Sequence, residues 1–289
     1  MGLSVNTNVA AINAYRNLSA TQTSLSKSLE KLSSGFRINR AADDAAGLAI
    51  SEGLRSQISG LTQAARNAQD GISVVQTAEG ALTEVHAILH RMRDLAVQAA
   101  NDSNSEEART NISTEARQLS EELDRIAKST NFNGTTLLDK VSGGTGATLN
   151  FQVGADGDVN SRIEVKLDSA NVASVASAMS FSATSAGGAT LNLFTHATAQ
   201  SAITAIDDQI KKISTARANL GAYQNRFEHT INSVNVAVEN LSASESRIRD
   251  TDMASEMVNF TKSQILSQAG TAMLAQANAI PQGVLKLLG

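Results

Sequence analysis

The 289-residue sequence contains no cysteine, no tryptophan and one proline, and aromatic residues make up only 3% of it. Without cysteine the chain cannot form a disulfide scaffold, a cysteine-ligated zinc site, an iron–sulfur site or a thiol nucleophile. Large rings supply much of the buried area in compact cores. Their scarcity therefore predicts thin, alanine-rich contacts between helices.

Long apolar runs and an excess of basic charge are also lacking. No segment approaches 18 consecutive apolar residues, so no transmembrane helix is expected. The first residues lack the basic region and apolar core of a secretory signal peptide. The formal net charge is -4, which argues against a nucleic-acid binder. We expect neither nucleic acid nor a membrane as a partner.

The most regular pattern lies between Ile206 and Ile248, where apolar residues recur in alternating steps of four and three. Shorter runs with this spacing cover residues 58–99 and 112–126. Sustained spacing of this kind predicts coiled-coil helices. The predicted coiled-coil core comprises Ile72, Leu82, Leu89, Leu119, Leu123, Leu220, Phe227, Ile231, Val234, Val238 and Leu241.

The predicted helices are long. A continuous helix over residues 44–100 would span roughly 85 Å, and one over residues 200–249 roughly 75 Å. A compact chain of this size has a radius of gyration of about 19 Å. We therefore predict a mainly α protein, an elongated rod of long coiled-coil helices contributed by both chain ends.

Both chain ends repeat the pattern with smaller residues, and such helices are marginal alone because little area is buried against the cost of ordering. We therefore expect both ends to need partners, and residues 1–40 and 255–289 to be disordered in a free subunit. The predicted self-assembly seam comprises Val5, Val9, Ile12, Leu25, Leu29, Leu32, Leu266, Met273, Ile280, Val284 and Leu287.

The middle of the chain differs from both ends. The sequence Asn-Phe-Asn-Gly at 131–134 signals a turn. Apolar residues alternate over 149–153 and again over 163–167, with a glycine-rich turn between them, which predicts a small β-hairpin. Residues 168–199 are rich in small residues, and we interpret them as a short exposed insert that is too small for an independent domain.

Few residues suggest chemistry. His86 and His90 lie four residues apart on one helix face, but no third ligand with motif spacing follows, so two ordinary histidines are favoured over a metal site. Asp43 and Asp44 are interpreted as a helix N-terminus, where acidic residues oppose the helix dipole. No constellation supports catalysis, and we expect neither an enzyme nor a cofactor.

Two long motifs carry a resemblance. Residues 32–51 (LSSGFRINRAADDAAGLAIS) and 247–288 (RIRDTDMASEMVNFTKSQILSQAGTAMLAQANAIPQGVLKLL) resemble the terminal signatures of bacterial flagellins. Shorter matches lie at Ser4–Asn8, at 93–98 and at Phe151–Gly154. The resemblance covers roughly residues 1–167 and 200–289.

This resemblance implies a filament subunit with two domains. Residues 1–43 with 250–289 would form the D0 terminal coiled coil. Residues 44–167 with 200–249 would form the D1 helical rod with its hairpin, and 168–199 would be the variable insert. It also implies unfolded export through a type III apparatus, polymerisation at the filament tip, and a secreted, extracellular flagellar filament used for swimming.

The partners implied by the resemblance are identical subunits, an export chaperone at the C-terminal helix, and the filament cap and junction proteins. Some flagellins are also ligands of the innate immune receptor Toll-like receptor 5, and the matching positions here are Arg91, Leu95 and Glu115. Packing of D1 is the alternative role for these three residues.

Two other functions were weighed. A flagellar hook–filament junction protein has related ends, but the complete C-terminal motif favours the filament protein. A secreted enzyme carried in the insert is disfavoured, because the insert is short and lacks the zinc-peptidase motif.

Overall fold

The computed structural model describes residues 8–139, 148–181 and 191–288. The chain divides into two compact units. Unit 1 comprises Met1–Ile58 and Glu239–Gly289, and unit 2 comprises Ser59–Val238. Two long helices, α2 (Ala45–Ala99) and α5 (His196–Arg249), contribute to both units. The predicted long helices and mainly α class are confirmed.

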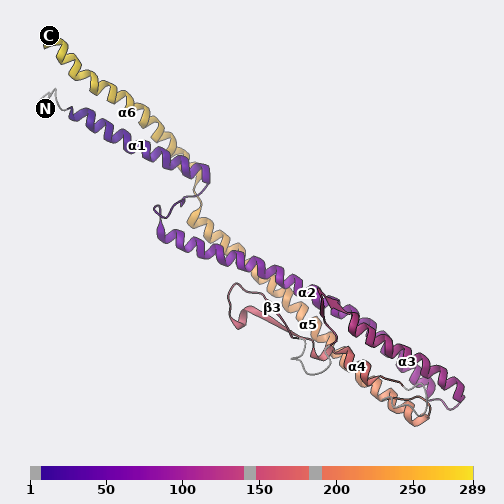
Figure 1. Cartoon of the computed structure of the whole chain (residues 1–289). Helices are drawn as coiled ribbons and strands as arrows, with labels where there is room; N and C mark the ends of the chain where they lie inside the picture. The colour runs from indigo at the N-terminus through magenta and orange to yellow at the C-terminus, as the bar shows by residue number, and fades with distance from the viewer. Residues whose placement is uncertain (1–7, 140–147, 182–190, 289) are drawn as a thin grey trace. The chain divides into compact units, whose positions relative to one another are not determined.

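Unit 1 contains α1 (Val9–Ser34) and α6 (Met253–Leu288), which lie side by side in opposite directions (Figure 1). At one end the Asn8 amide donates to the carbonyl oxygen of Ala277 at 2.8 Å. At the other end Lys31 lies 4.0 Å from the Glu256 carboxylate. Helix α1 ends at Gly35, whose φ of 76° requires the left-handed conformation that glycine adopts freely.

Two extended segments of unit 1, after α1 and before α6, pair with each other. The backbone N–H of Arg37 donates to the carbonyl of Arg249 at 2.6 Å, and Thr251 N–H donates to the carbonyl of Gly35 at 3.0 Å. Ile38, which follows, is 1% exposed. The chain then enters α2 at Asp44, whose side chain accepts from the N–H of Gly47 at 2.8 Å. The interpretation of Asp44 as a helix N-terminus is confirmed.

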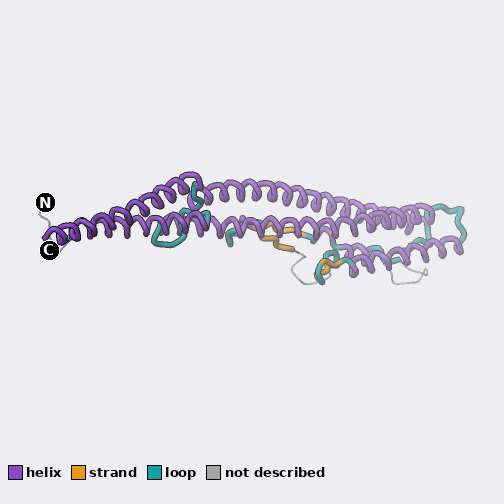
Figure 2. The backbone as a smooth tube through the Cα atoms, turned by 90° about the horizontal axis from the view of Figure 1, so that it is seen from above, coloured by secondary structure: helices purple, strands orange, loops and turns teal. Residues whose placement is uncertain are grey.

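Unit 2 is built on the α2 and α5 segments that run beside each other, with α3 (Glu106–Ser129) against them (Figure 2). Every residue of the predicted four-and-three series on α5 is buried or half-buried, which confirms the pattern. Glu79 of α2 pairs with two of the polar members of this series. It accepts a hydrogen bond from Gln224 at 3.1 Å and lies 3.8 Å from Arg217.

Two hairpins join unit 2. Strands β1 (Asn131–Phe132) and β2 (Thr135–Thr136) flank Asn133 and Gly134, both at positive φ, as a tight hairpin turn requires. Strands β3 (Thr148–Gln152) and β4 (Arg162–Lys166) pair antiparallel, which confirms the second hairpin. The Phe151 ring meets Phe227 of α5 edge to face, with ring centres 5.4 Å apart, and so docks β3 on the helices.

The segment after β4 differs from expectation. It forms two short elements, η2 (Asp168–Ala170) and α4 (Val172–Ala178), rather than an exposed loop. Val172, Val175 and Met179 are at most 3% exposed and belong to the main core. The prediction of an exposed insert is therefore wrong for these residues. Their small apolar side chains are buried beside α3, although the segment is too short to show a periodic pattern.

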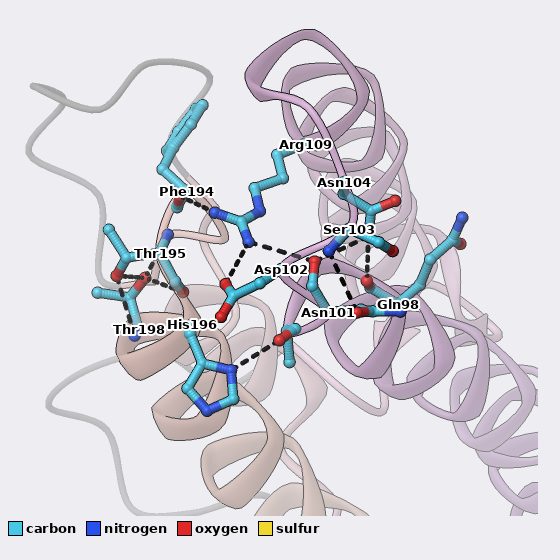
Figure 3. A network of polar contacts seen from close by, with 11 residues as sticks. Gln98, Asn101, Asp102, Ser103, Asn104, Arg109, Phe194, Thr195, His196 and Thr198 are labelled. Atoms are coloured by element: carbon cyan, nitrogen blue, oxygen red, sulfur yellow. Dashed lines mark hydrogen bonds and ion pairs between the residues drawn. The ribbon is translucent and has the colours of Figure 1, made fainter.

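A polar network fastens the start of α5 to the turn between α2 and α3 (Figure 3). The Arg109 guanidinium donates to the carbonyl of Phe194 and to the Asp102 carboxylate, each at 3.0 Å. His196 Nδ1 lies 2.7 Å from the carbonyl oxygen of Ala100, the first residue after α2. The Arg109 side chain is only 14% exposed and its bond to Phe194 is partly buried, whereas the Asp102 side chain is 81% exposed.

Candidate self-association surface

The two units differ in the exposure of their apolar side chains. Among the described side chains, unit 2 holds all of the buried apolar residues except Ile38 and Ala277. Unit 1 instead carries twelve of the fifteen large apolar residues that are exposed. Those twelve are Val9, Ile12, Tyr15, Leu29, Phe36, Ile50, Met253, Met257, Val258, Ile265, Leu266 and Met273. Exposed apolar residues gathered in this way mark an interaction surface.

The helices of unit 1 meet through small residues. On α6 the residues turned inward recur in steps of four and three from Glu256 to Ala277, and they include Ser263, Ser267 and Gly270. A Cβ added at Gly270 would lie 3.2 Å from the Leu18 side chain, so this contact is close. Some larger side chains, among them Phe260 and Leu274, are half-buried on this face, but many others lie on the outward faces.

The residues of the predicted self-assembly seam fall mainly on those outward faces. Leu25 and Leu32 are half-buried between the helices. Val5 lies outside the described residues, as do the side chains of Ile280, Val284 and Leu287. The exposed members are Val9, Ile12, Leu29, Leu266 and Met273. The structure thus leaves these five unpartnered within the chain, and their role in assembly stays a prediction.

The sequence reasoning missed part of this surface on α6. Met257, Val258 and Ile265 are 50%, 67% and 60% exposed. Together with Leu266 they line a shallow groove of about 510 Å³ along one side of α6. Their signal was available as a second apolar stripe beside the first, a pattern typical of a helix with more than one neighbour.

The predicted coiled-coil core residues of α2, α3 and α5 are placed inward. Leu119, Ile231, Val238 and Leu241 are half-buried. The others, Ile72, Leu82, Leu89, Leu123, Leu220, Phe227 and Val234, are buried.

The predicted receptor and packing patch is only partly at the surface. Arg91 of α2 and Glu115 of α3 are paired, with Arg91 Nη2 2.7 Å from a Glu115 oxygen, and their side chains are about half exposed. Leu95 is 1% exposed and belongs to the core. The structure brings Arg91 and Glu115 together as a surface pair, whereas Leu95 serves packing.

Among the titratable side chains of the described residues, Asp43 serves the local backbone rather than a metal or catalytic site. Asp43 accepts hydrogen bonds from the backbone N–H groups of Arg40 and Asn39, and these bonds lower the pKa of its carboxyl. No group of three or more histidine or acidic side chains that could hold a metal ion occurs among them. His86 and His90 do meet, with their Nε2 atoms 2.9 Å apart.

Family comparisons agree with this architecture. Residues 5–142 match the family described as the bacterial flagellin N-terminal helical region, and residues 203–288 match the bacterial flagellin C-terminal helical region. Within the described parts of the chain, none of the helices combines the length and apolar character needed to cross a membrane.

Individual proteins are similar along nearly the whole chain. A flagellin of Halalkalibacterium halodurans is 52% identical over 284 residues, covering 98% of this chain and 99% of that protein. The flagellar filament 33 kDa core protein of Treponema phagedenis is 49% identical over 290 residues, with the same coverage. A solved structure of a flagellar hook-associated protein from Vibrio parahaemolyticus shares the fold, with a TM-score of 0.56, 15% identity, and coverage of 72% of this chain and 100% of that one.

Proposed function

Because this chain belongs to the bacterial flagellin family, we propose that the outward apolar faces of α1 and α6 are the surfaces by which identical copies pack in the flagellar filament. The chain is a structural filament protein and not an enzyme. Its matches to curated flagellins favour the filament protein over the junction protein. The filament is a homopolymer that lies outside the cell.

One observation carries the assignment of the surface. Unit 1 exposes twelve large apolar residues while burying very few, so a solitary copy leaves these side chains in contact with water. Burial releases about 25 cal/mol per Å². Lateral packing of copies would cover these side chains and stabilise both helices at once. In this proposal the part of unit 1 formed by residues 1–43 with 250–289 supplies the D0 tube, and residues 44–167 with 200–249 supply D1.

Seeded polymerisation tests this surface. Heat-dissociated subunits should sediment after addition of filament fragments. Ile265→Asp places a charge on the exposed apolar face and should abolish sedimentation, whereas Ile265→Leu should retain it. Because Ile265 is 60% exposed, both variants should keep the wild-type helical content in circular dichroism. Normal polymerisation of Ile265→Asp would contradict the assignment.

The same exposed faces suit export. We propose that the subunit leaves the cell unfolded through the type III apparatus and adds at the filament tip, beneath the cap protein and beyond the junction proteins. An export chaperone would cover α6 beforehand, and the groove lined by Met257, Val258 and Ile265 supports an apolar contact there. Chaperone-bound subunits should fail to polymerise, and Ile265→Asp should weaken chaperone binding.

A receptor role rests on a smaller feature. The exposed pair of Arg91 and Glu115 supports recognition by Toll-like receptor 5. In a receptor reporter assay, monomeric Arg91→Ala should be weaker than wild type. Arg125→Ala, which removes another exposed, paired arginine from the same unit, should match wild type. Absence of any response to wild-type monomer would contradict this role.

A further inference from the structure

The only two histidines on α2 form an unusual pair. His86 is half-buried and His90 is exposed. Their Nε2 atoms lie 2.9 Å apart, and the rings form a T-shaped contact with an interplanar angle of 77°. Helix formation requires no imidazole at either position. The pair is therefore a feature that the structural role of the chain leaves unexplained.

The spacing of the two nitrogens fits a chelate. Imidazole nitrogens bind first-row transition metals at about 2.0–2.1 Å. At that bond length, two nitrogens 2.9 Å apart subtend about 90° at the metal. This angle is that of neighbouring ligands in square-planar or tetragonal sites, which Cu²⁺ and Ni²⁺ prefer. A tetrahedral ion such as Zn²⁺ would need the nitrogens about 3.3 Å apart.

The protonation states also suit metal binding. A metal takes the neutral imidazole. Burial, followed by the charges of His90 and Arg217, lowers the pKa of His86 and so favours its neutral form. His86 Nδ1 is buried and has no hydrogen-bond partner. In the metal-free chain one of the two Nε2 atoms carries the proton of the hydrogen bond between the rings. Metal binding shifts that proton to Nδ1 of the same ring, so that both Nε2 lone pairs face the ion.

The charges around His86 are partly balanced. His90 and Arg217 of α5 both act on His86 as positive groups. Glu79 of α2 lies 3.8 Å from Arg217 and offsets its charge. His90 faces solvent, so water can fill the remaining coordination positions. We infer that His86 and His90 form a two-histidine chelate for a divalent copper or nickel ion, one per subunit, on the surface of α2.

Nuclear magnetic resonance of the histidine rings tests the site directly. The sequence has four histidines, so wild-type monomer gives few ring signals. Substoichiometric CuCl₂ in a non-coordinating buffer at pH 7.5 should broaden the His86 and His90 signals first. Those of His196 and His229 should persist. Equal broadening of all four signals would overturn the proposal.

Titration with NiCl₂ measures the affinity of the subunit for Ni²⁺. His90→Gln and His86→Gln should each bind Ni²⁺ at least about tenfold more weakly than wild type, because each loses the second, tethered ligand. His229→Gln removes an exposed histidine from α5 and is the matched control, which should bind like wild type. Circular dichroism of each variant verifies folding. Unchanged affinity in His90→Gln, an exposed and conservative change, would refute the chelate.

Discussion

The guanidinium carbon of Arg249 lies 4.7 Å from the centre of the Phe36 ring, and Nη1 of the same arginine lies 3.0 Å from the Glu52 carboxylate. Arg249 ends α5, Phe36 follows α1 and Glu52 lies in α2. One side chain therefore ties together three segments of unit 1 where the chain passes between its helices. The Arg249 side chain is 15% exposed, and this shielding strengthens its contact with the Phe36 ring, whereas its partner Glu52 is 56% exposed.

Arg249→Ala should loosen this junction. A shielded cation–π contact and a charge-assisted hydrogen bond together contribute about 1–3 kcal/mol. Amide hydrogen exchange at Arg37 and Thr251, whose N–H groups bond across the junction, should accelerate at least about fivefold. Arg55→Ala is the control, since exposed Arg55 pairs with the same Glu52 at 3.2 Å. Equal acceleration in both variants would contradict the role of Arg249 in holding the three segments together.

Two glycines of α2 should respond oppositely to alanine. A Cβ at Gly71 would lie 2.7 Å from the Phe227 ring, which itself packs on Phe151. Gly71→Ala should lower the free energy of unfolding of unit 2 by about 1–3 kcal/mol. Gly80 has no atom within 4 Å of its added Cβ, so Gly80→Ala should raise it by up to about 1 kcal/mol. Urea denaturation followed by circular dichroism measures both, and a destabilised Gly80→Ala would contradict this reading.

The sequence predicted those features that depend on local periodicity. Steps of four and three on α5 place Leu220, Phe227 and Val234 inward because one face of that helix is apolar and the other polar. On α1 and α6 apolar residues occupy more than one face. The pattern alone therefore could not tell which face meets the other helix, and the small residues around Gly270 make that contact.

Contacts distant in sequence could not be predicted from the sequence. Arg249 and Glu52 are separated by 197 positions, and no periodic pattern in the sequence links them. The burial of α4 was missed for a related reason. Its seven residues are too few to show a helical period, and only their place beside α3 makes Val172 and Val175 core residues.

Arg109→Ala should release the start of α5. The change leaves the carbonyl of Phe194 and the Asp102 carboxylate without this donor (Figure 3). The loss of the part-buried, charge-assisted bond to Phe194 should lower the free energy of unfolding of unit 2 by about 1.5–3 kcal/mol, and loss of the pair with the exposed Asp102 should add little. Lys128→Ala, which removes an exposed ion pair with Asp124 on the same α3 helix, should lower the free energy of unfolding much less. The two losses are compared in one urea series.

Amide exchange on the free subunit should separate the two units. Residues 9–34 and 253–279, which bury little apolar area, should exchange at least about 100-fold faster than residues 72–99 of α2, which lie in the main core. Addition of filament seeds should protect the two terminal segments. Equal protection in the free subunit would show that α1 and α6 hold together without neighbouring copies.

Stability should also depend on pH through His86. Its pKa in the folded chain is lowered from 6.5, chiefly by burial and further by His90 and Arg217. Below pH 6.5 the unfolded chain therefore binds a proton that the folded chain resists, so stability falls as pH drops from 6.5 toward the folded pKa and is unaffected above 6.5. Urea midpoints measured with EDTA between pH 7.5 and 5.5 should decline less in His86→Gln than in wild type. His229→Gln should follow wild type, because that ring stands exposed on α5. If the urea midpoint of His86→Gln declined with falling pH as steeply as that of wild type, the acid sensitivity would come from other groups.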